Sequence, residues 1–149
     1  MESSPSPPDN LSFGNVQLRF VEVKPGDPAR RLVPFYHFRI LHADDTDVGH
    51  INFKIGETDH VRLYVGHIGF EIIQSFRGQG FARRACQALA PFVRSIYPEV
   101  ILTCDPDNGA SKKTIENLGA TFIEKVEIPP QDPAYQSGAR WKLRYRWKP

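Results

Sequence analysis

The chain has 149 residues, enough for one domain with a single hydrophobic core. Hydrophobic residues make up 40% and charged residues 24% of it, and a net charge of +2 does not by itself indicate nucleic-acid binding. No apolar run is long enough to span a membrane, and the first ten residues lack the basic and apolar parts of a secretory signal. We therefore expect a cytoplasmic protein, with Cys86 and Cys104 reduced and buried.

The first third of the chain predicts a tail followed by three strands. Proline and serine dominate the first ten residues, so we assign residues 1–12 to a disordered tail and residues 13–149 to one folded domain. The connection 24–34 is rich in proline and is expected to be a loop. Strands this close together favour an antiparallel meander. They are predicted at residues 16–23, 35–42 and 48–55.

The middle of the chain, GHIGFEIIQSFRGQGFARR, predicts a strand, a glycine-containing loop and the start of a helix. Residues 65–73 alternate as a strand does, and residues 81–95 carry apolar side chains at helical intervals. Gly78 and Gly80 would let a ligand approach bare backbone. A helix beginning there presents unpaired N–H groups and the positive end of its dipole, so we expect an anion site, most naturally for a phosphate.

The predicted helix has Pro91 in its interior. An interior proline costs about 3 kcal/mol, so we expect a bend or a break near Gln87. Residues 100–104 are nearly all apolar, which is typical of a buried parallel strand, and the strand–helix–strand order predicts a right-handed crossover. Beyond a turn at residues 105–108, the pattern predicts a helix at 109–118 ended by Gly119, a strand at 120–128, a loop at 129–138 and a strand at 140–148.

The last strand alternates an aromatic face with a basic one. A row of like charges could follow a nucleic-acid backbone. The more ordinary explanation is the solvated face of an edge strand, so nucleic acid is not the favoured partner. The basic residues are Arg140, Lys142, Arg144, Arg146 and Lys148.

Two short motifs resemble those of a known family. The glycine loop is no Walker loop, because Gly-Lys-Ser/Thr is missing, and no dinucleotide fingerprint, because Arg83 stands where a third small residue is needed. Residues 77–82, RGQGFA, match the Arg/Gln-x-x-Gly-x-Gly/Ala loop of the GNAT acetyltransferase superfamily. The block from Asn108 to Ala120 is similar to the second family motif, Asn-x-x-Ala/Ser followed by Glu-x-x-Gly-Phe. The resemblance covers residues 16–147, and within the superfamily the chain looks like the branch that holds ribosomal-protein N-terminal acetyltransferases and many uncharacterised relatives.

The resemblance implies an α/β (α+β) fold with a mixed, mostly antiparallel central sheet and helices on its faces. Its fourth and fifth strands, at residues 65–73 and 100–104, would be parallel and splay apart. The two helices that the family usually places after its first strand must be reduced or absent, because residues 24–34 are too few and too rich in proline. Those helices usually wall the acceptor site, so the resemblance does not identify the acceptor.

The resemblance also implies acetyl-CoA as co-substrate, with pantetheine paired to the free backbone of Ile72 and pyrophosphate bound by the amides of residues 78–82. No metal is implied, and the histidines show no metal-ligand spacing. The residues expected to bind acetyl-CoA are Ile72, Ile73, Arg77, Gly78, Gln79, Gly80, Phe81, Ala82, Arg83, Asn108, Ser111 and Lys112.

The catalytic residues are predicted partly from a departure. Ile115 stands where many family members have a tyrosine general acid, and it cannot donate a proton. Ser111, one turn earlier, is the candidate replacement, the alternative being that it only begins the helix. Glu71 is the favoured general base because it lies near the end of the central strand, although it could simply be a polar residue on an open face. His67, on the same predicted strand face, is expected to be structural.

The sequence therefore predicts an acetyl-CoA-dependent N-acetyltransferase that transfers an acetyl group directly, in a ternary complex, to a primary amine of a small molecule or to a protein N-terminus. Ile115 keeps open an inactive acyl-CoA-binding sensor or assembly subunit, and the basic strand keeps open an RNA- or ribosome-associated module. The missing helices are expected to expose an apolar sheet face that a second copy covers, giving a homodimer. Phe35, Phe38, Phe53 and Tyr64 are the candidates for that face.

Overall fold

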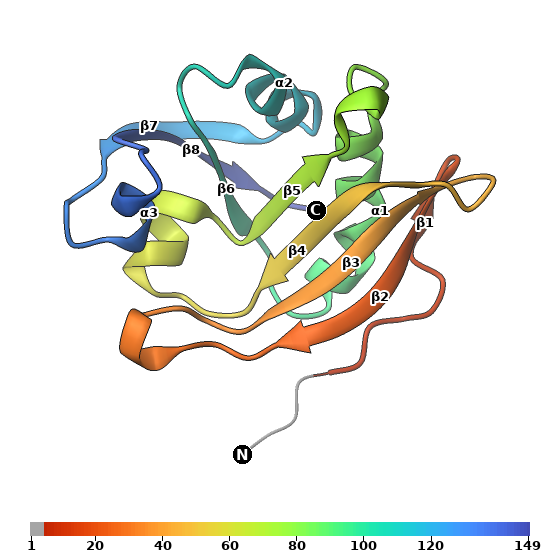
Figure 1. Ribbon diagram of the computed structural model, residues 1–149, viewed down its shortest axis with the longest axis horizontal. Coiled ribbons are helices and arrows are strands. Elements are labelled where there is room, and N and C mark those ends of the chain that lie inside the picture. Colours follow the sequence, from red (N-terminus) through yellow and green to blue (C-terminus); the bar gives the residue numbers. More distant parts are fainter. Residues whose placement is uncertain (1–4) are drawn as a thin grey trace.

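The computed structural model describes residues 5–149, whose strands form two antiparallel sheets (Figure 1). The first has five strands in the order β1-β2-β3-β4-β5, and the second has three in the order β6-β8-β7. The strands of the first sheet are Ser12–Phe13, Val16–Lys24, Phe35–His42, Asp47–Lys54 and Ile68–Ile72. Those of the second are Val100–Cys104 (β6), Thr121–Glu127 (β7) and Trp141–Trp147 (β8). The prediction of one central sheet is therefore wrong, because the strands form two separate sheets.

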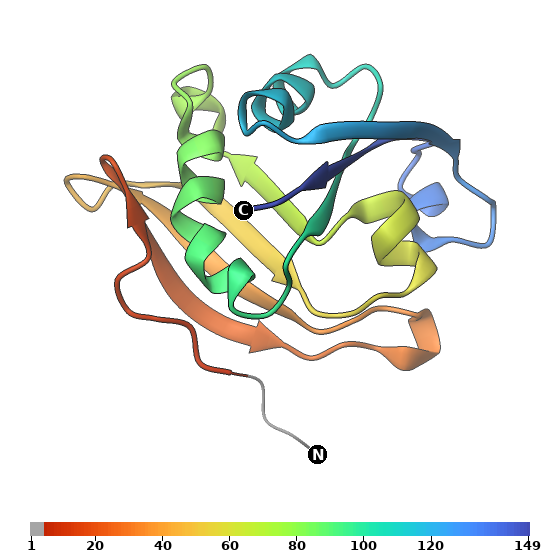
Figure 2. The same ribbon diagram turned by 180° about the vertical axis from the view of Figure 1, so that it is seen from behind.

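The longest helix, α1 (Phe81–Arg94), lies across one face of the first sheet (Figure 2). It buries a stripe that includes Ala85, Leu89 and Phe92. The helix α2 (Gly109–Asn117) begins near the start of α1, and α3 (Pro133–Gln136) lies in the connection before β8 (Figure 1). Shorter turns are the 3-10 helices Pro28–Arg30 and Gln74–Phe76 and the π-helix His60–Val65.

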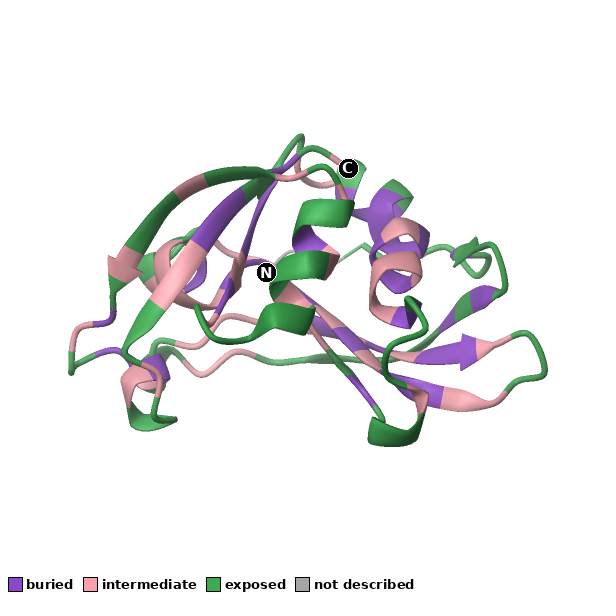
Figure 3. Cartoon of the chain, turned by 90° about the horizontal axis from the view of Figure 1, so that it is seen from above, coloured by how far each residue is buried: buried purple, intermediate pink, exposed green. Residues whose placement is uncertain are grey.

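The core lies between α1 and the first sheet. Tyr36, Phe38 and Phe53 are buried there, and Phe92 meets the Tyr36 ring edge-on at 4.9 Å between centroids. Burial of each such side chain is worth about 1.5–3 kcal/mol. Buried positions alternate with less buried ones along the strands, visible as bands of purple and pink in Figure 3.

The opposite face of this sheet is polar. Its positions on β3 and β4 are half-buried, and the side chain of Arg39 pairs with Asp47 through two hydrogen bonds of 2.8 Å. The expectation of an exposed apolar face there is wrong, because Phe38 and Phe53 belong to the core and Phe35 and Tyr64 are half-buried. An exposed apolar face therefore no longer supports the homodimer, which stays a prediction. The polar positions are His37, Arg39, His50, Asn52 and Lys54.

The two sheets meet where β5 begins. The His67 N–H donates to the Ile101 carbonyl at 2.8 Å, and the Ile101 N–H donates to His67 Nδ1 at 2.9 Å. Nearby, the Thr103 hydroxyl donates to the Tyr64 carbonyl at 3.0 Å. Beyond these contacts β5 pairs with β4, and β6 pairs with β8. The join between the sheets is therefore confined to one end of the two strands.

Three local predictions are corrected by the structure. The strand β5 starts at Ile68 rather than 65, because the π-helix precedes it and ends at Gly66, whose φ is 75°. The helix α1 passes through the exposed Pro91 without a break, so the predicted break is wrong and the predicted bend stays a prediction. The strand β8 is the middle strand of its sheet and not an edge.

The N-terminal segment and the loop after β2 are both ordered by contacts. The Tyr36 hydroxyl donates to the Pro5 carbonyl at 2.5 Å, and Leu11 is buried in the core. The tail assigned to residues 1–12 therefore includes packed residues, and its first four positions lie outside the described part. Residues 25–34 hold a single 3-10 turn, Pro28–Arg30, in place of longer helices.

Candidate active site

A cavity of about 720 Å³ opens between the end of β5, the glycine loop, the start of α1 and the first turns of α2. Most of the predicted site residues line it: Glu71, Ile72, Arg77, Gly78, Gln79, Gly80, Phe81, Ala82, Arg83, Asn108 and Ser111. Ile73 and Lys112 do not. Lining residues that the sequence analysis missed are Phe70, Phe76, Ala110, Thr114 and Asn117, and Lys113 lines the cavity as well. Ser111, Thr114 and Asn117 follow a three-residue helical interval, which could have indicated this face.

The glycine loop presents backbone to the cavity. Gly78 has φ 81° and Gly80 has φ 77°, a left-handed backbone conformation that residues other than glycine rarely adopt. A Cβ at either position would meet no atom within 4 Å, so the space beside both is open. Gly80 is also the N-cap of α1, and the Arg84 N–H is the first to bond back, to the Gly80 carbonyl at 3.2 Å. The preceding amides of α1 are thus available to an anion.

Two arginines brace this loop from within. Arg77 Nε donates to the Ile72 carbonyl at 2.8 Å, and Arg84 Nη2 donates to the Gln79 carbonyl at 2.7 Å. The Arg84 guanidinium also lies 4.8 Å from the centre of the Phe81 ring. The Ile72 carbonyl therefore already accepts one hydrogen bond, and the pairing of pantetheine with this stretch of backbone stays a prediction. Arg83 lines the cavity and, within residues 5–149, makes no ion pair.

The helix α2 supplies the opposite wall. Asn108 caps it, because its Oδ1 accepts the Ser111 N–H at 3.1 Å. This hydrogen bond fixes the first turn and leaves the Ser111 hydroxyl at the cavity. Ile115 is only 1% exposed and packs in the core. Ser111 thus provides the first hydroxyl group along α2, whereas Ile115 packs in the core.

The two candidate bases have different surroundings. The Glu71 side chain is 69% exposed, lines the cavity and has Oε1 4.0 Å from Arg77 Nη2. His67 is fully buried, does not line the cavity and has its ring 5.2 Å from that of Tyr97. Burial lowers the pKa of His67 and so keeps the ring neutral. Of the two, only Glu71 can reach a ligand in the cavity.

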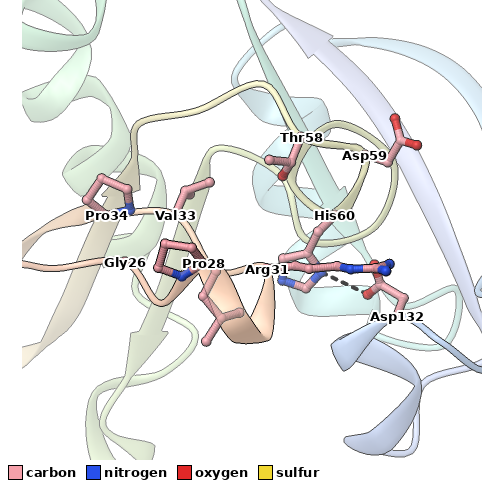
Figure 4. Close-up of a pocket in the computed structure, with 10 residues that line it drawn as sticks. Gly26, Pro28, Arg31, Val33, Pro34, Thr58, Asp59, His60 and Asp132 are labelled. Atoms are coloured by element: carbon pink, nitrogen blue, oxygen red, sulfur yellow. Dashed lines mark hydrogen bonds and ion pairs between the residues drawn. The ribbon is translucent and has the colours of Figure 1, made fainter.

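A second cavity, of about 660 Å³, lies between the 24–34 loop, the π-helix and α3 (Figure 4). His60 Nδ1 and Asp132 Oδ1 are 2.8 Å apart in it, and the same carboxylate oxygen accepts the Ala134 N–H at 2.9 Å. The pair therefore ties the π-helix to the cap of α3. Thr58, the hydroxyl residue of this cavity, has its Oγ1 3.3 Å from the Val61 N–H. These contacts give the His60–Asp132 pair a structural role, which is to hold the π-helix against α3.

The basic face of β8 is largely neutralised. Lys142 Nζ pairs with Asp105 Oδ1 at 2.8 Å, and Arg146 Nε lies 3.5 Å from Glu99 Oε2. Arg144 is buried and pairs with Glu124. These carboxylates remove most of the charge that a nucleic-acid backbone would need.

The comparison with protein families identifies the fold. Residues 17–121 match the family model described as an acetyltransferase (GNAT) domain, so the chain belongs to the GNAT acetyltransferase family. Its fold is the α+β type of that family, with mostly antiparallel sheets and few helices. No curated protein matches the chain.

Solved structures with the same fold include three acetyltransferases. RimL, a ribosomal-protein alpha-N-acetyltransferase solved with coenzyme A, is 21% identical over 75% of this chain and 60% of its own, with a TM-score of 0.56. The microcin C7 self-immunity acetyltransferase MccE, solved with acetyl-CoA and AMP, is 18% identical over 77% and 61%, with a TM-score of 0.57. The ribosomal-protein-S5-alanine acetyltransferase of Vibrio fischeri is 16% identical over 77% and 64%, also at 0.57. The chain thus spans less than two thirds of each.

The part of the chain that the structure describes offers neither a membrane-crossing helix nor a metal site. No helix there is long and apolar enough to cross a bilayer. No group of three or more histidine, cysteine, aspartate or glutamate side chains in those residues could hold a metal ion.

Proposed function

We propose that this protein is an acetyl-CoA-dependent N-acetyltransferase that transfers the acetyl group directly, in a ternary complex, to a primary amine of a small molecule or to a protein N-terminus. The observation that carries the proposal is one cavity walled by the glycine loop on one side and by Asn108 and Ser111 on the other. Family membership and the coenzyme A complexes of RimL and MccE support the same donor.

The pyrophosphate of acetyl-CoA would lie on the free amides at the start of α1. These N–H groups and the helix dipole favour a doubly charged ligand, and Arg83 adds a cation on the same wall. Glycines at 78 and 80 let the phosphate oxygens reach the backbone.

The pantetheine would lie between β5 and β6, in a gap that corresponds to the splayed strands of the family. The Ile73 N–H donates to Val48 of β4, so by the strand's alternation the backbone groups of Phe70 and Ile72 point the other way, towards β6. With the Ile72 carbonyl held by Arg77, the remaining partners are the Ile72 N–H and both groups of Phe70. The thioester would then lie near Phe70, at the inner end of the cavity.

The chemistry is acyl transfer from sulfur to nitrogen. The neutral acceptor amine attacks the thioester carbonyl carbon, the C–S bond breaks and the amine proton is lost. In this proposal Glu71, exposed at the cavity, takes that proton, and the Ser111 hydroxyl donates to the leaving thiolate. Holding both substrates side by side supplies much of the rate.

An inactive acyl-CoA-binding subunit is the second candidate. The observation that favours it is Ile115, packed in the core at a position where many relatives carry the proton donor. An RNA-associated module is less favoured, because the basic residues of β8 are paired.

Release of the CoA thiol in the presence of an acceptor panel tests the proposal. The panel combines small primary amines with short peptides that have free N-termini, each beside its N-acetylated form as control. We expect thiol release that depends on a free amine. Binding of acetyl-CoA without release for any acceptor would favour the inactive subunit, and salt-dependent RNA binding without acetyl-CoA binding would favour the RNA module.

A further inference from the structure

Lys54, the last residue of β4, is a half-buried amine that the proposed mechanism does not use. Ile51 and Phe53 face the core, so Lys54 lies on the opposite, polar face, together with His50. Its Nζ lies 3.5 Å from the point where a Cβ of Gly69 would stand. Because Gly69 has no side chain, the amine lies directly against the backbone of β5.

This position lies one residue beyond the cavity along β5, because the lining includes Phe70 but neither Gly69 nor Lys54. Phe70 is the lining residue of β5 farthest along the strand from the glycine loop, and Gly69 is its neighbour. Glu71, the next residue on the polar face of β5 after Gly69, lines the same cavity. The Lys54 amine therefore lies where the polar face meets the expected place of the thioester.

The surroundings of Lys54 favour its neutral form. In residues 5–149 it makes no ion pair, and burial together with the charge of Lys142 lowers its pKa to about 8. Asp105 pairs with Lys142 at 2.8 Å. The other titratable groups on neighbouring positions are His50 on the same face of β4, Glu71 opposite it on β5, and His67, whose ring contacts Tyr97. At pH 7.5 the neutral fraction of such an amine exceeds that of an ordinary lysine by on the order of a hundredfold.

We propose that Lys54 is a self-acylation site, at which the protein transfers the acyl group of its own bound acyl-CoA to Nζ when no external amine is present. The inference rests on the proposed function for the acyl donor. The Nζ lone pair attacks the thioester carbonyl carbon, a C–N bond forms and the C–S bond breaks with its electron pair on sulfur. The proton released from Nζ passes through water to the thiolate, so the products are an amide and free CoA thiol.

Acylation changes the face from which an acceptor would approach. The amide carries no charge, which ends the repulsion between Lys54 and Lys142. It also places an acyl group beside Gly69, so external amines compete with Lys54 for the same thioester. An acceptor that reaches the site first therefore protects Lys54.

Peptide mass spectrometry of the full chain incubated with acetyl-CoA at pH 7.5, without any amine, tests the proposal. We expect acetylation of Lys54 to be about tenfold or more faster than that of the exposed Lys24, Lys125 and Lys148. The rate of Lys54 acetylation should rise with pH and level off above about pH 8. Lys54→Arg, which keeps the charge, should remove the modification and leave acetylation of the other lysines unchanged.

Calorimetry with acetyl-CoA separates the possible failures. If acetyl-CoA binds and Lys54 stays unmodified, self-acylation is wrong and the proposed function stands. If acetyl-CoA does not bind, the proposed function fails and the inference fails with it. Equal modification of Lys54 in wild type and in Gly80→Arg, which blocks the loop, would show ordinary solution chemistry and overturn the inference.

Discussion

His67 Nδ1 accepts the Ile101 N–H at 2.9 Å, while the His67 N–H donates to the Ile101 carbonyl at 2.8 Å. A single residue thereby joins the two sheets through both its backbone and its ring. Because Nδ1 is an acceptor, the proton of the neutral ring is on Nε2, which lies 3.3 Å from Glu57 Oε2. The contact between β5 and β6 at this end thus depends partly on one neutral histidine, beside the Thr103–Tyr64 hydrogen bond.

The first prediction concerns stability against pH. Burial lowers the pKa of His67 in the folded protein, so the unfolded chain binds its proton more readily. Stability should therefore fall as the pH drops below the ordinary histidine pKa of about 6.5. His67→Asn keeps an acceptor near Nδ1 and removes the titration. It should cost about 1–3 kcal/mol at pH 7.5 and then lose less than wild type on going to pH 5.5.

Urea denaturation at both pH values provides that measurement. The pKa of His50 is also lowered, mainly by burial, but His50 is common to both proteins and cancels in the difference. If wild type and His67→Asn lose equal stability between pH 7.5 and pH 5.5, the pH dependence does not come from His67.

A second prediction isolates the Ser111 hydroxyl. Ser111→Ala leaves the cap intact, because Asn108 accepts the backbone N–H at this position. If the hydroxyl donates to the thiolate, kcat should fall about tenfold or more while acetyl-CoA affinity changes little. Thr114→Ala removes another hydroxyl residue from the wall of the same cavity and serves as the matched control. Equal kcat losses in the two variants would remove Ser111 from the chemistry.

The third prediction concerns Glu71. Glu71→Gln keeps the size of this exposed side chain and removes its basicity. Turnover should fall most at low pH, where few acceptor amines are already neutral, and should approach the wild-type value at high pH. The pH profile of kcat/KM, with Glu99→Gln as a control outside the cavity, decides the point. A Glu71→Gln profile that superimposes on the wild type would show that no proton passes to this carboxylate.

The sequence predicted several strands well because their patterns are local. The boundaries of β2, β3, β4 and β6 agree with the predictions to within one residue, since each is an alternating or apolar run bounded by turn residues. Alternation along β8 showed which face is apolar, but it does not say which strands lie beside it. The middle position of β8 and the division into two sheets therefore needed the structure.

The site was predictable only where it depends on short motifs. The glycine loop and the start of α2 could be named from their spacing, and the structure brings them to one cavity. The pKa of Lys54 depends on burial and on Lys142, from a strand distant in sequence, so no local pattern indicated it. The core position of Ile115 likewise follows from how α2 packs, and spacing alone had suggested only a missing proton donor.

Titration calorimetry of acetyl-CoA against wild type, Gly80→Arg and Gly119→Arg tests the central claim most directly. Gly80 and Gly119 have nearly equal φ values, 77° and 81°, and a Cβ at either meets no atom within 4 Å, but only Gly80 lines the cavity. An arginine charge would attract phosphate, so lost binding in Gly80→Arg would come from a blocked or distorted loop backbone. The account predicts binding to wild type and Gly119→Arg and a loss of about a hundredfold or more, near 2.7 kcal/mol, in Gly80→Arg. Equal affinity in all three proteins would contradict it.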